Sequence, residues 1–93
     1  MSPDSPTPQS KEPRHHFLKT EIDVWEAVAA GAKTAEFRKD DRGFQVGDTL
    51  VLLRGTARAM VPGSDAIERL VTHIVRGPDF GIPDGYALLS MRV

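Results

Sequence analysis

Hydrophobic and polar residues alternate along the chain with two different periods, and each change of period marks an expected element. Residues 14–19, R-H-H-F-L-K, predict a short first strand. Apolar residues at helical spacing follow, with Trp25 in the middle of the stripe, and predict a short helix that packs on a sheet. We expect Thr20 to cap the start of this helix and Gly31 to end it. Trp25 is therefore the expected anchor of the helix.

After the helix the period changes to two, which is typical of a strand with one face in the core. Ala35 and Phe37 are expected to face the core. Glu36 and Arg38 then face the opposite side. The polar run K-D-D-R-G at residues 39–43 is expected to end this strand as a turn.

The second half of the chain predicts further strands. Residues 49–53 are apolar on both sides of the pleat, which indicates a strand covered on both faces. Residues 67–75 mix polar and apolar positions, as a strand does where it bends across a small barrel. Residues 77–85 are expected to cap the barrel, and residues 86–93 to close the fold. Residues 54–65 fit an edge strand or a loop.

One clear helix is too few for the crossovers of a doubly wound sheet. The expected fold class is therefore α+β, mainly β: a small mixed β-barrel of five or six strands with one short helix at its side. Residues 1–13 carry four of the seven prolines and are expected to form a disordered leader. Residues 14–93 then form the single domain.

Composition narrows the classes of partner. A formal net charge of -1 gives no broad positive field, so binding to nucleic acid would need a local cluster of cations and a shaped pocket. The chain has no cysteine, no recognisable secretory signal and no apolar run approaching the roughly 20 residues that span a bilayer. We expect a cytoplasmic protein that does not enter membranes.

Residues 31–38, G-A-K-T-A-E-F-R, concentrate charge of both signs at the corner between helix and strand. Lys33 and Arg38 are candidates to bind a phosphate or a base carbonyl. Glu36, ionised beside two cations, is a candidate acceptor for the exocyclic amino group of a base. The alternative is a salt-bridged corner without a ligand, in which the two cations only neutralise Glu36.

Four other residues are candidates for the same site. We expect His16 and Lys19 to lie near the cleft, Arg42 to contact a phosphate and Tyr86 to offer stacking surface. A metal site is not expected, because His15 and His16 point to opposite faces of a strand and no cysteine or third histidine lies nearby. No cofactor is expected either.

With these motifs placed, the chain resembles the ASCH domains of the PUA-like superfamily, whose signature is G-x-K-x-x-E-x-R. Four further blocks are similar to a bacterial and phage branch of unknown function: H-x-L-K at residues 16–19, R-K-x-D-R at 38–42, F-Q-V-G-D at 44–48 and F-G-I-P-x-G-Y at 80–86. The resemblance covers roughly residues 15–93. It implies a pseudo-barrel with a cleft beside the signature that binds RNA or a modified base.

The expected function is therefore an RNA-binding or modified-nucleotide-binding module whose cleft is lined by Lys33, Glu36 and Arg38. One alternative is a small amidohydrolase acting on an acylated nucleoside, in which Lys33 activates Thr34 or a water and Glu36 is the acid or base. In the hydrolases that the chain resembles, a threonine occupies the position of Glu36, so binding is favoured over catalysis. A second alternative is an adaptor that binds protein.

Overall fold

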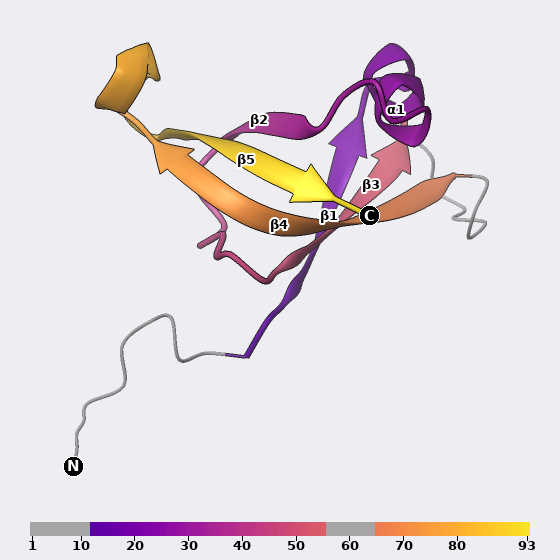
Figure 1. Cartoon of the computed structure of the whole chain (residues 1–93), viewed down its shortest axis with the longest axis horizontal. Helices are drawn as coiled ribbons and strands as arrows, with labels where there is room; N and C mark the ends of the chain where they lie inside the picture. The colour runs from indigo at the N-terminus through magenta and orange to yellow at the C-terminus, as the bar shows by residue number, and fades with distance from the viewer. Residues whose placement is uncertain (1–11, 56–64) are drawn as a thin grey trace.

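The computed structural model describes residues 12–55 and 65–93 (Figure 1). The elements follow in the order β1 (His15–Thr20), α1 (Ile22–Ala29), β2 (Ala35–Lys39), β3 (Thr49–Arg54), β4 (Ala66–Arg76), the 3-10 turn η2 (Asp79–Gly81) and β5 (Tyr86–Arg92). Residues 1–11 of the expected leader lie outside these ranges. So do residues 56–64 of the segment that fits either an edge strand or a loop. No helix in the described part is long and apolar enough to cross a membrane.

The five strands form one curled sheet, a half-barrel, in the order β1-β3-β4-β5-β2 (Figure 1). The pair β1 and β3 is parallel, and the other three pairs are antiparallel. The short helix α1 lies at one end of the sheet. The expected α+β, mainly β architecture is confirmed. The strands β1 and β2 are the two edges of this sheet.

The long strand β4 gives the sheet its curl. Its first half pairs with β3 and its second half with β5, and the register shifts between Val71 and His73. A β-bulge of this kind bends a strand and increases its twist. The expectation that this segment bends across a small barrel is confirmed, and the bend brings β2 round toward β1.

The hydrophobic core lies on the concave side of the sheet, under α1. Four consecutive residues of β3, Leu50 to Leu53, are buried, which confirms that this strand is covered on both faces. Of the residues expected to point inward at the end of the chain, Ala87, Leu89 and Met91 are buried in β5, whereas Val93 follows the strand and is 89 % exposed. The core cluster consists of Leu18, Trp25, Val28, Phe44, Leu50, Leu52, Val71, Ala87, Leu89 and Met91.

Trp25 anchors the helix, as its position in the apolar stripe predicts. Its ring is buried, and its indole Nε1 donates a hydrogen bond of 2.9 Å to the carbonyl oxygen of Leu52. Gly31 ends the helix with φ +81°, a conformation that suits glycine. The expected cap is wrong: Thr20 is the last residue of β1, and its hydroxyl donates to the carbonyl of Leu18.

The face assignment of β2 is also wrong. Glu36 is buried at 4 % exposure, whereas Phe37 is 49 % exposed. Periodicity fixes only the alternation, and here the carboxylate goes inward because Arg38 and Lys33 compensate its charge. Phe37 keeps partial cover outside by stacking on Tyr86.

The loop after β4 does not cap the barrel. The β4 and β5 strands carry it beyond the rest of the sheet, at the left of Figure 1. Phe80, at its tip, is 90 % exposed. The apolar residues of this loop therefore project away from the core that they were expected to cover.

We predict that Trp25→Phe lowers the free energy of unfolding by about 1–3 kcal/mol, because it leaves the buried Leu52 carbonyl without its donor. Urea unfolding followed by circular dichroism measures this loss. Phe80→Leu is the control and should change the midpoint little, since Phe80 is exposed. An unchanged midpoint for Trp25→Phe would show that the helix is not held by this contact.

Candidate functional site

A cleft of about 370 Å³ opens between the start of α1 and the edge strand β2. One wall, from the end of β1 and the start of α1, consists of Lys19, Thr20, Glu21 and Val24. The other, from the segment leading into β2 and from β2 itself, consists of Lys33, Glu36, Phe37, Arg38 and Lys39. The cleft therefore contains the three charged residues of the G-x-K-x-x-E-x-R motif together with Lys19, as the sequence predicts.

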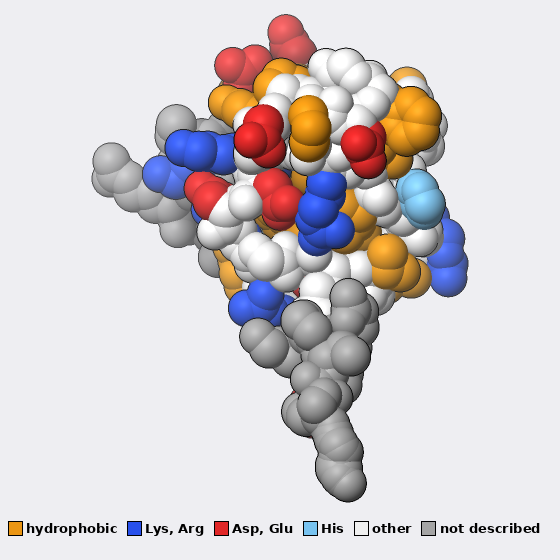
Figure 2. Space-filling model, turned by 90° about the vertical axis from the view of Figure 1, so that its left-hand side faces the viewer, with side chains coloured by type: hydrophobic (Ala, Val, Ile, Leu, Met, Phe, Trp, Pro, Cys, Tyr) orange, Lys and Arg blue, Asp and Glu red, His pale blue; other side chains and the backbone are white. Residues whose placement is uncertain are grey.

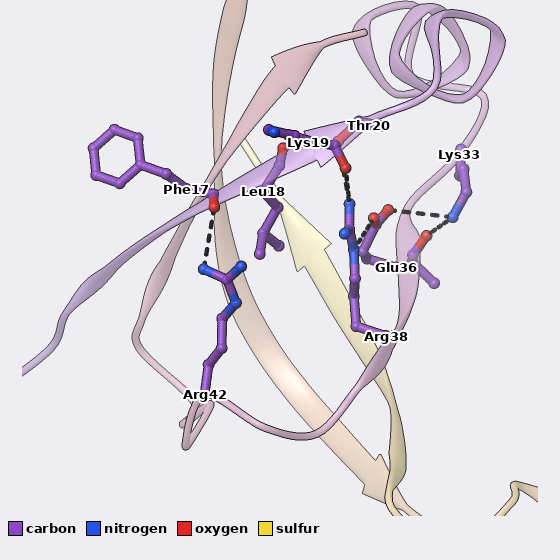
Figure 3. A network of polar contacts seen from close by, with 9 residues as sticks. Phe17, Leu18, Lys19, Thr20, Lys33, Glu36, Arg38 and Arg42 are labelled. Atoms are coloured by element: carbon purple, nitrogen blue, oxygen red, sulfur yellow. Dashed lines mark hydrogen bonds and ion pairs between the residues drawn. The ribbon is translucent and has the colours of Figure 1, made fainter. Parts of the chain in front are cut away.

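Glu36 is the most buried charged group of the cleft. Its Oε2 accepts a hydrogen bond of 2.7 Å from Nε of Arg38, and its Oε1 lies 3.7 Å from Nζ of Lys33 (Figure 3). Oε1 is buried and has no hydrogen-bond partner within the described part of the chain. A buried acceptor without a partner is costly and uncommon, so this oxygen is available for a donor from a ligand.

Arg38 spans the gap between the two edges of the sheet. Its Nη2 donates to the carbonyl of Lys19 at 2.7 Å and lies 3.3 Å from the hydroxyl of Thr20, while its Nε holds Glu36 (Figure 3). Arg42 makes a second contact of this kind, because its Nη1 donates to the carbonyl of Phe17 at 3.2 Å. The backbone N–H and C=O groups of an edge strand need hydrogen-bond partners. Here the guanidinium groups of Arg38 and Arg42 donate to carbonyl oxygens of β1.

Positive charge is concentrated around the cleft. Three of the four lysines of the chain, Lys19, Lys33 and Lys39, line it. With Arg38, Glu21 and Glu36 they give four cations and two carboxylates, a local excess of two positive charges in a chain of net charge -1. On the face drawn in Figure 2, by contrast, acidic, basic and hydrophobic side chains are interspersed. An anion is therefore attracted to the cleft by a local field.

The structure places His16 outside the cleft. Its side chain is buried, with Nε2 2.7 Å from Oδ2 of Asp48 and the ring 4.7 Å from that of Phe44. Asp48 also accepts hydrogen bonds from the backbone N–H groups of Arg14 and Gln45. This cluster joins β1 to the turn before β3 and belongs to the core.

The remaining candidates lie around the cleft rather than in it. Tyr86 stacks on Phe37, with ring centroids 5.3 Å apart and an interplanar angle of 13°. Thr34 is exposed and does not line the cleft. Sequence reasoning missed Thr20 and Phe37 as lining residues, because it assigned one to a helix cap and the other to the core.

Metal-ligating side chains do not gather in the described residues: no group of three or more histidine, aspartate, glutamate or cysteine side chains is close enough to hold an ion. The pair of His16 and Asp48 offers only two such groups, and both are already hydrogen-bonded. The cleft itself is lined by ammonium, guanidinium and carboxylate groups.

The Asp48 carboxylate couples stability to pH. Burial would raise its pKa, but the hydrogen bonds from His16 and from the backbone of Arg14 and Gln45 outweigh this effect and hold the pKa below its ordinary value of 3.8. A depressed folded-state pKa stabilises the fold above pH 3.8, and this contribution is lost as the pH falls through the lower folded-state value.

We predict that Asp48→Asn is less stable than the wild type by about 1–3 kcal/mol at neutral pH, because the charged acceptor is lost. The difference should begin to shrink as the pH falls below 3.8, where the carboxylate of the unfolded chain takes up protons, and should be lost as the pH passes the lower folded-state pKa. Urea unfolding between pH 7 and pH 3 measures it, with the exposed loop variant Asp84→Asn as control. A difference that stays constant over this range would contradict the role of the Asp48 charge.

Comparison with known protein families gives a match. A family model described as "Domain of unknown function (DUF3850)" matches residues 15–91, from the first residue of β1 into β5. No curated protein matches the chain. The matched region contains β1 to β4, most of β5, the helix and both walls of the cleft. The chain therefore belongs to the DUF3850 family.

Proposed function

We propose that this protein binds RNA, or a modified nucleotide, in the cleft between α1 and β2. The observation that carries the proposal is the combination of a buried acceptor and surrounding cations. Oε1 of Glu36 lacks a hydrogen-bond partner in the described part of the chain, and three lysines line the same cleft. A ligand that suits both features has an N–H donor and negative charge on one molecule, as a nucleotide does.

The lysines supply the sequence-independent part of this binding. Ammonium groups attract phosphates as point charges, and each phosphate contact releases counterions from the nucleic acid. Lys33 is partly exposed, and its Nζ contacts the carbonyl of Ala35 and lies near Glu36. Because its side chain is long and flexible, it can move toward a phosphate and thereby uncover the buried oxygen of Glu36.

Glu36 supplies the specific part. A carboxylate accepts hydrogen bonds, and the N4 amino group of cytosine is a donor that glutamate and aspartate recognise in base readout. Since Arg38 already occupies Oε2, one oxygen of the carboxylate is left for the ligand. Bases with an exocyclic amino group are therefore preferred over uracil, which has none.

The position of Thr34 argues against hydrolysis through this threonine. A threonine nucleophile must lie beside its base, and Thr34 is exposed outside the cleft lining. The hydroxyl of Thr20 does line the cleft, but it already donates to the carbonyl of Leu18. The hydrolase and adaptor alternatives remain hypotheses that no contact in the described residues favours.

We predict that Lys33→Ala weakens binding to a fluorescently labelled single-stranded RNA by roughly 3- to 10-fold and lowers the slope of log affinity against log salt by about 0.7. Fluorescence anisotropy titrations at several salt concentrations measure both quantities. Arg92→Ala is the matched control: it removes one positive charge from an exposed site on β5 outside the cleft lining. Equal effects of the two substitutions, or no binding by the wild type, would refute the proposal.

We predict that the wild type binds oligocytidine more tightly than oligouridine, and that Glu36→Gln removes most of this preference. The reason is that a carboxylate oxygen accepts the cytosine amino group, whereas a glutamine amide can also donate to a uracil carbonyl. The preference should be about 5-fold or more, corresponding to roughly 1 kcal/mol or more of discrimination for such a contact. Competition titrations with unlabelled oligonucleotides measure it. A preference that Glu36→Gln leaves intact would assign base recognition to other groups.

A further inference from the structure

Phe37 occupies an unusual place in the cleft. It alternates with Glu36 on β2, so its side chain lies on the outer face of the sheet while Glu36 is buried inside. Both nevertheless line the same cleft, because β2 is an edge strand and the cleft extends around its free edge. A ligand that starts beside Glu36 and continues past the edge of β2 therefore meets the ring of Phe37.

Tyr86 fixes the orientation of this ring. The two rings are nearly parallel, at 13°, with centroids 5.3 Å apart, and Tyr86 does not line the cleft. One face of Phe37 is thus covered by Tyr86. Phe37 is 49 % exposed, so part of its surface remains free for a further planar group.

The surroundings of the pair match a nucleic-acid strand. In the sheet register Lys39 lies opposite Tyr86, so its side chain is on the same face of the sheet as the two aromatic rings. Bases stack on aromatic side chains while cations follow the phosphates in proteins that bind single strands. The cleft, at about 370 Å³, is near the lower end of the roughly 300–1,000 Å³ typical of small-molecule sites, so it holds about one nucleotide. A longer strand that passes the edge of β2 meets the ring of Phe37.

We propose that Phe37 stacks on a base of single-stranded RNA at the mouth of the cleft, with Tyr86 as the positioning residue behind it. This inference rests on the proposed function and extends it from a nucleotide pocket to a strand-binding surface. The apolar side chain of Leu88, opposite Phe37 in the register, would equally suit a protein partner. The cations of the adjoining cleft favour RNA, and the protein partner becomes an outcome of the test.

The test compares two RNA hexamers and two variants of the protein, each with one phenylalanine replaced. The strands are a labelled RNA hexamer and an abasic hexamer with the same phosphates. The variants are Phe37→Leu and Phe17→Leu, the latter a matched control because Phe17 is 51 % exposed on the other edge strand and does not line the cleft. Urea unfolding confirms that both variants fold, and anisotropy titrations at one salt concentration give the affinities.

We predict that Phe37→Leu weakens binding to the RNA hexamer by roughly 5- to 150-fold and leaves binding to the abasic hexamer unchanged, because only the stacking is lost. Tyr86→Leu should also weaken binding to the RNA hexamer and not to the abasic hexamer, with a smaller loss of affinity. Phe17→Leu should bind both strands like the wild type.

Three results would overturn the inference. The first is that Phe37→Leu binds the RNA hexamer as Phe17→Leu does. The second is that Phe37→Leu weakens binding to both hexamers equally, which would indicate a general rather than a base-dependent effect. The third is that sedimentation shows self-association of the wild type through Phe37 with no change in RNA affinity on substitution, which would assign the surface to a protein contact. The proposed function survives these results if Lys33→Ala still weakens RNA binding. If the wild type binds neither strand, both proposals fail.

Discussion

The hydrogen-bonded bridge that Arg38 forms across the open edge of the sheet is the contact on which the cleft depends. One guanidinium group joins Glu36 of β2 to the carbonyl of Lys19 on β1, where a closed barrel would have a backbone ladder. Removing one partner of a buried ion pair costs about 3–5 kcal/mol, because the other charge stays buried without compensation. The same guanidinium group therefore holds the two walls of the cleft at their spacing, through the Lys19 carbonyl, and compensates the buried carboxylate of Glu36.

The Arg38 bridge reconciles two interpretations of the G-x-K-x-x-E-x-R motif that the sequence presents as alternatives. The salt bridges and the groups that the proposed ligand would contact are both present, divided between the atoms of the same residues. Arg38 uses Nε and Nη2 within the protein, so its role is chiefly structural. Oε1 of Glu36 lacks a hydrogen-bond partner in the described part of the chain, and the lysines carry their charge on flexible stems. In the proposed function, ligand binding therefore falls mainly to Glu36 and the lysines.

Local patterns in the sequence predicted the helix and the strands. The order of the strands and the environment of single side chains depend on pairing between distant residues. The helix, its anchor Trp25 and the doubly covered strand β3 follow from spacing that is visible within a few residues. The strand order does not: β2 pairs with β5, and the parallel partner of β1 is β3. His16 shows the consequence for a single side chain. Its partner Asp48 lies 32 residues away, and nothing near His16 in the sequence indicates that it is buried with a carboxylate.

The error in the faces of β2 has the greatest consequence for the site. Alternation is symmetric, so hydrophobicity argued for Phe37 inside and Glu36 outside, and only the contacts of Arg38 with both Glu36 and Lys19 reverse the choice. With the expected orientation, Glu36 would be solvated and would offer no buried acceptor. Phe37 would be in the core and would offer no ring to a ligand. The orientation that costs the fold a buried carboxylate is thus the one that gives the cleft both its acceptor and its aromatic rim, as expected where function and not stability governs a residue.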